Sequence, residues 1–131
     1  MCDYKLKFKA NATKNTFVAF VGRNNKQNDK LSLKTAGKSD LWFHTHDITG
    51  SHAILFTEGK EVPEESIAEA AMLAAYHSKG RNSSQVPVDY TFAKFVKKPA
   101  GAKPGMVIFT NNSTVYVKPD EEKVNRMKEG K

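Results

Sequence analysis

One stretch of this chain, residues 61–80, has the pattern of a long helix and therefore limits the folds open to the other segments. Ile67 and alanines 70, 71 and 74 recur at helical spacing, and alanine has the highest intrinsic helix propensity. Pro63 suits a first helical turn, and Gly80 suits the residue that ends a helix. We predict a helix over about residues 63–80 whose small side chains allow close packing on a sheet.

The remaining segments are short. Most alternate between apolar and polar residues, whereas residues 16–21 and 53–56 are continuously apolar, and both patterns are typical of strands. We predict strands at residues 4–10, 16–21, 31–33, 40–46, 53–56 and 86–92, with Pro87 marking an edge strand or the start of a strand. Asn111 and Asn112 suit a two-residue turn, which predicts a hairpin that pairs Ile108 with Val115. The expected class is α+β, with a mainly antiparallel sheet of several strands and hairpins and one long helix.

Two polar segments lie outside these elements. Residues 22–30 (GRNNKQNDK) are predicted to form a loop that either closes turns or donates hydrogen bonds to phosphates. Residues 120–131 are charged and read as a frayed tail or a short terminal helix. A length of 131 residues fits a single domain with one core.

Residues 40–52 (DLWFHTHDITGSH) gather the chemically versatile side chains of the chain. On an extended strand, Leu41 and Phe43 fall on one face, predicted to be core. The other face carries Asp40, Trp42, His44 and His46. The following turn and strand are expected to bring His52 close to His44.

The overall charge favours a polyanionic partner. The formal net charge is +7, and lysines and arginines are concentrated in residues 1–40 and 81–119. No apolar run approaches the ~20 residues of a membrane span, and the chain does not open on a hydrophobic signal region. Cys2 is the single cysteine, so no internal disulfide can form. We expect a cytoplasmic protein that does not bind membranes.

The histidine-rich stretch raises two hypotheses, a metal site and an enzyme site. His44, His46, Asp47 and His52 are all ligand types, but their spacing matches no established metal-binding pattern. Ser51 lies in no GxSxG nucleophile elbow, and the sequence carries no phosphate-binding glycine motif followed by a helix. We therefore predict a binding protein, not an enzyme, without metal or cofactor.

Several short motifs, taken in order, resemble the NFACT-R domain. The resemblance covers roughly residues 15–119. The motifs are GRNNKQNDKL (22–31), DLWFH (40–44), GSH (50–52), AAMLAAYHS (70–78), VDYT (88–91), KKP (97–99) and GAKPG (101–105). Two positions depart from the family pattern, in which a basic residue is common where His46 stands and proline where Thr49 stands. On this basis we expect an N-terminal strand or extension at 1–14, an NFACT-R-like domain at 15–119 and a charged tail at 120–131.

The resemblance implies an RNA-binding module, with tRNA or ribosomal RNA as the partner and no DNA expected. Larger members of the family are ribosome-associated quality-control factors that engage obstructed large ribosomal subunits and tRNA and, in bacteria, support alanine tailing of stalled chains. This chain lacks their other domains, so we do not expect tailing by this chain alone. Two alternatives remain: a tRNA-modification enzyme or its RNA-delivery subunit, and a protein-interaction module, because some members are described as fibronectin-binding.

The expected RNA-binding residues fall into three groups. Trp42 is either a core residue or a platform for a base, and Asp40, His44 and His52 either hydrogen-bond RNA or hold Trp42 in place. Arg23, Lys97, Lys98 and Lys103 are expected to contact phosphates. Asn24 and Asn25 complete the predicted site.

Overall fold

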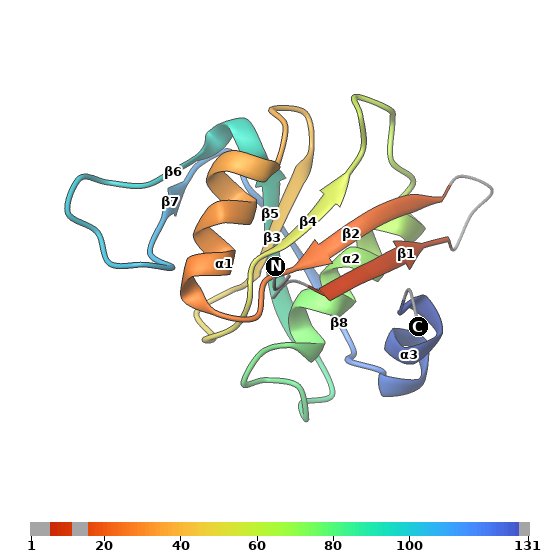
Figure 1. The fold of residues 1–131 in the computed structure, drawn as a ribbon. Coiled ribbons are helices and arrows are strands. Elements are labelled where there is room, and N and C mark those ends of the chain that lie inside the picture. Colours follow the sequence, from red (N-terminus) through yellow and green to blue (C-terminus); the bar gives the residue numbers. More distant parts are fainter. Residues whose placement is uncertain (1–5, 12–15, 129–131) are drawn as a thin grey trace.

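The structure is a computed structural model that describes residues 6–11 and 16–128. A six-stranded sheet has the order β1-β2-β4-β3-β5-β8, and every neighbouring pair is antiparallel (Figure 1). A second sheet holds two short strands, β6 and β7. The strands are β1 (Leu6–Ala10), β2 (Phe17–Val21), β3 (Leu41–Thr45), β4 (Ala53–Phe56), β5 (Val86–Phe92), β6 (Val96–Lys97), β7 (Ile108–Phe109) and β8 (Ser113–Val117). The predicted α+β class is confirmed.

Helix α2 (Glu64–Tyr76) is the predicted long helix. It begins directly after Pro63, with Glu64 and Glu65 in its first turn, where carboxylates offset the positive end of the helix dipole. It ends before the predicted Gly80, because Ser78 leaves the helix to form an antiparallel bridge with Gly50.

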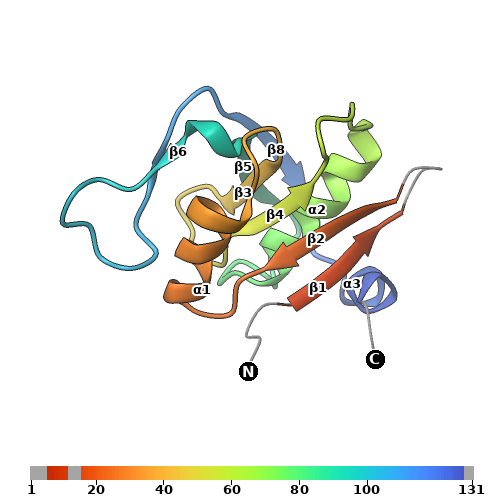
Figure 2. The ribbon, with the colours of Figure 1, turned by 45° about the horizontal axis from the view of Figure 1, so that its top comes forward.

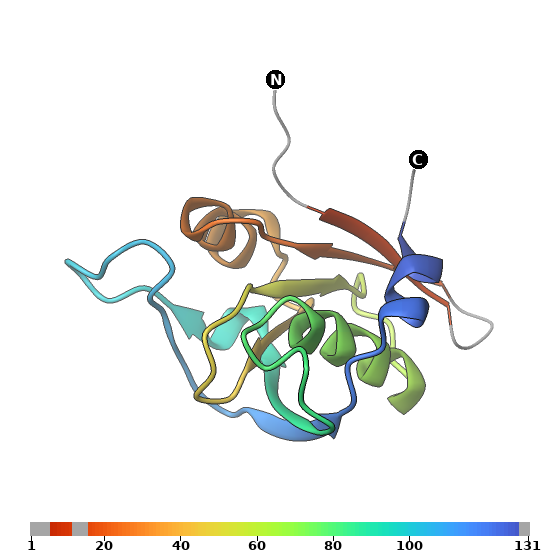
Figure 3. The same cartoon turned by 90° about the horizontal axis from the view of Figure 1, so that it is seen from below.

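The alanines of α2 let it lie close against one face of the large sheet, and Figure 3 shows the green helix between β4 and β8. Ala70, Ala71, Ala74 and Ala75 are fully buried in the main core. The strand residues of this core include Phe17, Ala19, Leu41, Phe43, Leu55, Val86 and Val88. Leu41 and Phe43 therefore face the core, as the alternation predicts. Short α3 (Glu121–Met127), capped by Asp120, adds Val124 and Met127, which confirms the terminal-helix alternative for the tail.

The opposite face of the sheet is covered by a helix that sequence patterns missed. Residues 22–30 do not form only a loop, and residues 31–33 are not a strand: α1 (Asn25–Lys30) continues into a π-helical segment, η1 (Leu31–Thr35). Figures 1 and 2 show α1 lying across the strands on the side away from α2. Asn24 caps α1 by accepting a hydrogen bond from the backbone N–H of Gln27 at 2.8 Å.

A second, smaller core lies beneath this helix. It consists of Leu31, Trp42, Ile54 and Val96, with Phe109 packed against it. Because Leu31 is the only apolar residue of α1 and η1 that is fully buried, the helix has no regular apolar stripe for sequence analysis to detect. Tertiary contacts, and not periodicity, place the helix here.

The predicted hairpin around Asn111 and Asn112 is wrong. β7 pairs with β6, and β8 pairs with β5, so that Val115 lies opposite Val88 and not opposite Ile108. Thr91 Oγ1 donates to the carbonyl oxygen of Thr110 at 2.9 Å and holds the connection between the two sheets. Alternation predicts the strands correctly but contains no information about which strand each one pairs with.

The N-terminal strands and β5 agree with the sequence. β1 exposes Lys7 and Lys9 and buries Phe8 and Ala10; its predicted first residues, like Cys2 and residues 129–131, lie outside the described part of the chain. β5 is flanked by β3 and β8, so the edge-strand alternative for Pro87 is wrong and the strand-start alternative holds. Among the described residues, no helix is both long and apolar enough to cross a membrane.

Candidate nucleic-acid interface

Trp42 is a core residue in this structure. It is 1% exposed, and its indole lies 4.6 Å from the Phe109 ring and stacks nearly parallel to the His44 imidazole, with ring centroids 6.0 Å apart. The indole N–H donates to Nδ1 of His52 at 3.3 Å. A base therefore has no access to the Trp42 ring, and the core alternative is the one the structure shows.

His52 links three elements beneath α1. The predicted proximity to His44 is confirmed, with ring centroids 5.3 Å apart. Nδ1 of His52 accepts from the Trp42 indole and lies 2.7 Å from Ser32 Oγ, so the neutral ring carries its proton on Nε2. Burial, and then the charge of His44, lower the pKa of His52 to about 4. His52 therefore supports the core as a neutral acceptor and is not available as a surface ligand.

Asp40 is also structural. Its buried carboxylate accepts backbone N–H groups from Gly37 and Thr57, each at 2.8 Å, and from Glu58 at 3.3 Å. These bonds fix the turns before β3 and after β4. A carboxylate whose oxygens are occupied in this way holds the sheet in place and has little capacity left for RNA.

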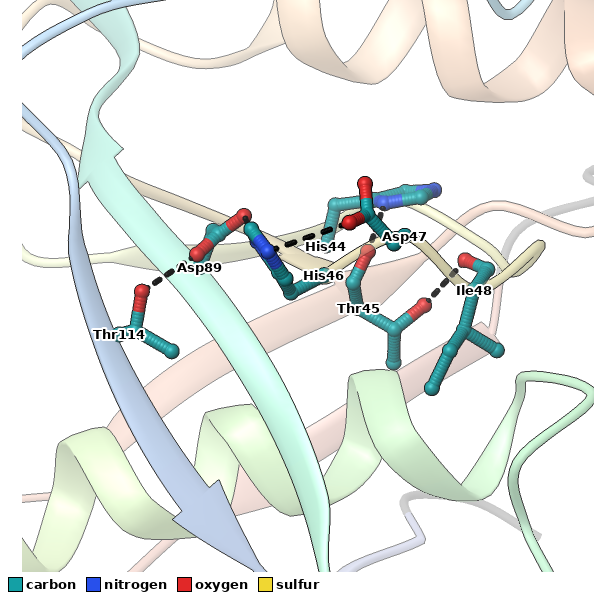
Figure 4. Close-up of polar contacts among 7 residues, drawn as sticks. All are labelled: His44, Thr45, His46, Asp47, Ile48, Asp89 and Thr114. Atoms are coloured by element: carbon teal, nitrogen blue, oxygen red, sulfur yellow. Dashed lines mark hydrogen bonds and ion pairs between the residues drawn. The ribbon is translucent and has the colours of Figure 1, made fainter.

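His46 lies at the end of β3 in a chain of polar contacts (Figure 4). Its Nδ1 is 2.8 Å from Asp89 Oδ2, and Asp89 in turn accepts a 2.6 Å hydrogen bond from Thr114 Oγ1. On the other side of the ring, Nε2 lies 3.3 Å from Asp47 Oδ2. The hydrogen bond to Asp89, together with the negative charges of Asp89 and Asp47, raises the pKa of His46 above its usual 6.5.

A groove of about 570 Å³ opens in front of His44 and His46. Its wall is formed by the end of β3 and the turn that follows it, by the start of α1, and by the segment before β7. The lining residues are Asn25, Trp42, His44, Thr45, His46, Asp47, Ile48, Thr49, Gly50, His52, Asp89, Pro104, Gly105, Met106, Val107 and Phe109. Of the contacting rings of Trp42, His44 and His52, only that of His44 is partly exposed. Its Nδ1 donates to the carbonyl oxygen of Thr45 at 2.7 Å.

The segment between β6 and β7 projects beyond α1 (Figure 2). Asp29 of α1 holds it through Lys98 and Gly105. Lys98 Nζ forms a 3.1 Å ion pair with Asp29 and donates to the carbonyl oxygen of Lys103 at 2.6 Å. The backbone N–H of Gly105 donates to Asp29 at 3.0 Å. Gly105 has φ +86°, and a Cβ there would lie 2.8 Å from Asn25 Oδ1, so this close approach requires glycine. Lys98 therefore holds the segment in place.

The predicted site residues divide into two sets. Trp42, Asp40, His52 and Lys98 are engaged in packing or internal bonds, and Asn24 caps α1. Those left on the surface are Arg23, Asn25, Lys97 and Lys103, with His44 half-buried in the groove. Sequence analysis missed Ser32, Asp89 and Phe109, which hold His52, His46 and Trp42; no local signal marks a residue whose role depends on a distant partner.

The groove offers hydrogen-bonding groups and two accessible imidazoles, His44 and His46, with exposed cations on neighbouring segments. These groups suit binding of a ligand with phosphates and polar base edges. Within the described part of the chain, no group of three or more histidine, cysteine or acidic residues has the arrangement of a metal site.

The chain has relatives among known proteins. Residues 6–111 match the family model described as the NFACT protein RNA binding domain, and the chain belongs to this NFACT-R family. It is 49% identical over 108 residues to the Rqc2 homolog RqcH of Bacillus subtilis (strain 168), a match that covers 82% of this chain and 19% of that protein. The RqcH of Streptococcus suis (strain 05ZYH33) is 45% identical over 117 residues, covering 89% and 21%.

A solved structure has the same fold. The C-terminal part of the fibronectin/fibrinogen-binding protein from Streptococcus suis matches with a TM-score of 0.91 and 41% identity, over 98% of this chain and 51% of that chain. The chain spans about a fifth of the length of the RqcH proteins it matches. The family and the fold are therefore established for this domain.

Proposed function

We propose that this domain is a non-catalytic RNA-binding module and that RNA enters the groove beside β3. The observation that carries the proposal is the match of residues 6–111 to the RNA-binding domain of NFACT proteins. The net charge of +7 is consistent with a polyanionic ligand.

We infer different tasks for the surface residues from their positions. Arg23, Lys97 and Lys103 are exposed and supply cations for phosphates. Asn25 and His44 lie in the groove wall, where an amide and an imidazole can hydrogen-bond to a base or ribose. Trp42 contributes indirectly, because its stacking fixes the orientation of the His44 ring.

The finer part of the proposal concerns the RNA and its setting. The RqcH relatives support a role in ribosome-associated quality control in the cytoplasm, with tRNA or ribosomal RNA of the large subunit as the ligand. Crosslinking in cells, followed by sequencing of the attached RNA, distinguishes tRNA from ribosomal RNA. Recovery of neither class above background contradicts this part of the proposal.

Binding measurements with purified protein test the site itself. The Lys97→Gln/Lys103→Gln variant should bind tRNA more weakly, and the slope of log affinity against log salt should fall by about one for each phosphate that is no longer neutralised. Lys118→Gln/Lys123→Gln removes the same charge from exposed positions elsewhere and is the matched control. Equal effects of the two variants would show that charge alone, and not this site, determines binding.

One alternative has a specific observation in its favour. The structurally similar streptococcal protein is named for fibronectin and fibrinogen binding. Immobilised fibronectin, tested beside tRNA with the same variants, separates the two functions: saturable binding to fibronectin without binding to RNA would favour the protein-interaction module. Turnover of tRNA to a modified product would instead favour the enzyme alternative.

A further inference from the structure

A second surface lies outside the groove, where β5 runs through a short 3₁₀ turn, η2 (Ala93–Phe95), into β6. We call it the aromatic-lysine patch; it consists of Phe92, Lys94, Phe95, Lys97 and Ile108. Phe92 is 45% exposed and Ile108 is 58% exposed, two of the four large apolar side chains that stand out on the described surface. Exposed apolar residues gathered in one place mark binding sites more often than isolated ones do.

The geometry joins these side chains into one surface. The Lys94 ammonium lies 5.7 Å from the centre of the Phe92 ring and 5.2 Å from that of Phe95, so one cation stands over both rings. Next to them is a depression of about 400 Å³, lined by Lys94, Phe95, Lys97, Ile108, Phe109 and Thr110. None of these described lining residues is acidic, so the surface complements a negatively charged ligand.

The patch is physically connected to the groove. Phe109 lines both depressions, and its ring also packs against Trp42. A single strand that occupies the groove can therefore continue over Phe109 onto the patch without leaving the protein surface.

The combination of rings and lysines favours single-stranded over double-stranded RNA. Contacts to a duplex backbone need cations and polar donors but no exposed aromatic rings, since paired bases are stacked on one another. Unpaired bases offer their flat faces, and proteins that bind single strands combine aromatic platforms with a cationic track. Phe92 and Phe95 provide such platforms here, and Lys94 and Lys97 provide the cations.

We propose that the aromatic-lysine patch is a stacking subsite for unpaired RNA nucleotides, in which Phe95 or Phe92 takes a base while Lys94 and Lys97 meet the flanking phosphates. The proposal rests on the RNA-binding function proposed above and adds the class of RNA recognised. It assigns the stacking role to rings other than Trp42, which is buried.

Two probes test this subsite, a short oligoadenylate and an RNA duplex with the same number of phosphates. Phe95→Leu, which keeps an apolar side chain but removes the ring, should weaken oligoadenylate binding about tenfold and leave duplex binding unchanged. Phe95→Tyr should retain the affinity. Tyr116→Leu is the matched control, because it removes an exposed ring on β8, outside the patch.

Because Phe95 is partly buried, its substitution could affect folding. The exposed Phe92 is therefore substituted in a second variant, so that a folding defect in one variant does not decide the result. Phe92→Leu should also reduce oligoadenylate binding, and circular dichroism verifies that each variant is folded. An oligonucleotide carrying 5-iodouridine should crosslink to Phe92 or Phe95 on irradiation, and mass spectrometry identifies the residue.

The outcomes separate this inference from the proposed function. Binding of both probes, with no loss in either leucine variant and crosslinks confined to groove residues, keeps RNA binding but overturns the subsite. Equal loss of duplex and oligoadenylate binding overturns it as well, because stacking on an unpaired base must discriminate between them. Failure of the unmodified protein to bind any RNA overturns the proposed function and the subsite together.

Discussion

The two faces of the large sheet are built on different principles. The face toward α2 is closed by small alanines against aliphatic and aromatic strand residues, and its stability comes from apolar packing. The face toward α1 has a core of four buried apolar residues among those described, and beside it His52 accepts hydrogen bonds from Trp42 and Ser32. Apolar packing depends little on the protonation state of any one group, whereas a buried polar network depends on each of its members.

The groove beside β3 lies on the face with the smaller core. On the other face, α2 packs closely against the sheet, and the hollow beside α3 is lined by acidic as well as basic side chains, such as Glu65 and Lys123. On the α1 side, His44 contacts Trp42 and His52 of the small core and also reaches the groove, where His46 lies beside it. The side proposed to bind RNA is therefore the side with fewer buried apolar residues to hold it together.

Truncating the central ring of each face gives the largest expected effect. Trp42→Ala and its neighbour Phe43→Ala should each lower the free energy of unfolding by about 3–5 kcal/mol, because each removes a fully buried aromatic side chain from a packed core. Urea denaturation followed by circular dichroism measures both. A loss below about 1 kcal/mol for Trp42→Ala would mean that the smaller core does not contribute as packed residues do.

Acid should weaken the α1 face through His52. The pKa of His52 is lowered from 6.5 to about 4 in the folded protein, so its contribution is complete above pH 6.5 and is lost as pH falls from there to about 4. The loss should amount to about 3 kcal/mol. The pH dependence of unfolding, measured beside His52→Leu, isolates this residue from other titrating groups. An unchanged pH dependence in that variant would contradict the prediction.

Removing the Lys98 ion pair should have a small effect on stability and a clear local one. Lys98→Gln should lower the free energy of unfolding by about 1 kcal/mol or less, because the Lys98–Asp29 pair is partly exposed to solvent. Hydrogen exchange at the Gly105 amide should accelerate, since the segment is held to α1 at that point. Lys97→Gln, at an exposed neighbour, is the control, and equal acceleration in both variants would exclude a specific role for Lys98.

The protonation of His46 should change the free energy of unfolding in the direction opposite to that of His52. Its raised pKa means that the stabilisation from its contacts is present below pH 6.5 and is lost as pH rises through the folded-state pKa. A histidine NMR titration should place this pKa above 6.5. Asp89→Asn should lower it more than Asp47→Asn does, because the hydrogen bond to Asp89 is the largest cause. The reverse order would show that Asp47 is the dominant partner.

Part of this organisation can be predicted from sequence because it depends on local periodicity. The alanine spacing of α2, the alternation of β1, β3 and β5, the apolar run of β2, and the closeness of His44 and His52 all follow from residues near one another in the chain. The motifs that resemble the NFACT-R domain are local as well, and the family they indicate is confirmed. These features involve short segments whose side-chain directions are set by helix and strand geometry.

The tertiary structure decided what covers each face and which strands pair. The period of two along β3 places Trp42 and Phe43 on different faces of the sheet. It does not reveal that α1, a helix without an apolar stripe, covers Trp42. The pairing of β8 with β5, the anchoring of Lys98 on Asp29 and the binding of Asp40 to three backbone amides join residues distant in sequence. Such contacts depend on the packing of the whole chain, because a side chain's local pattern specifies its direction but not its partner.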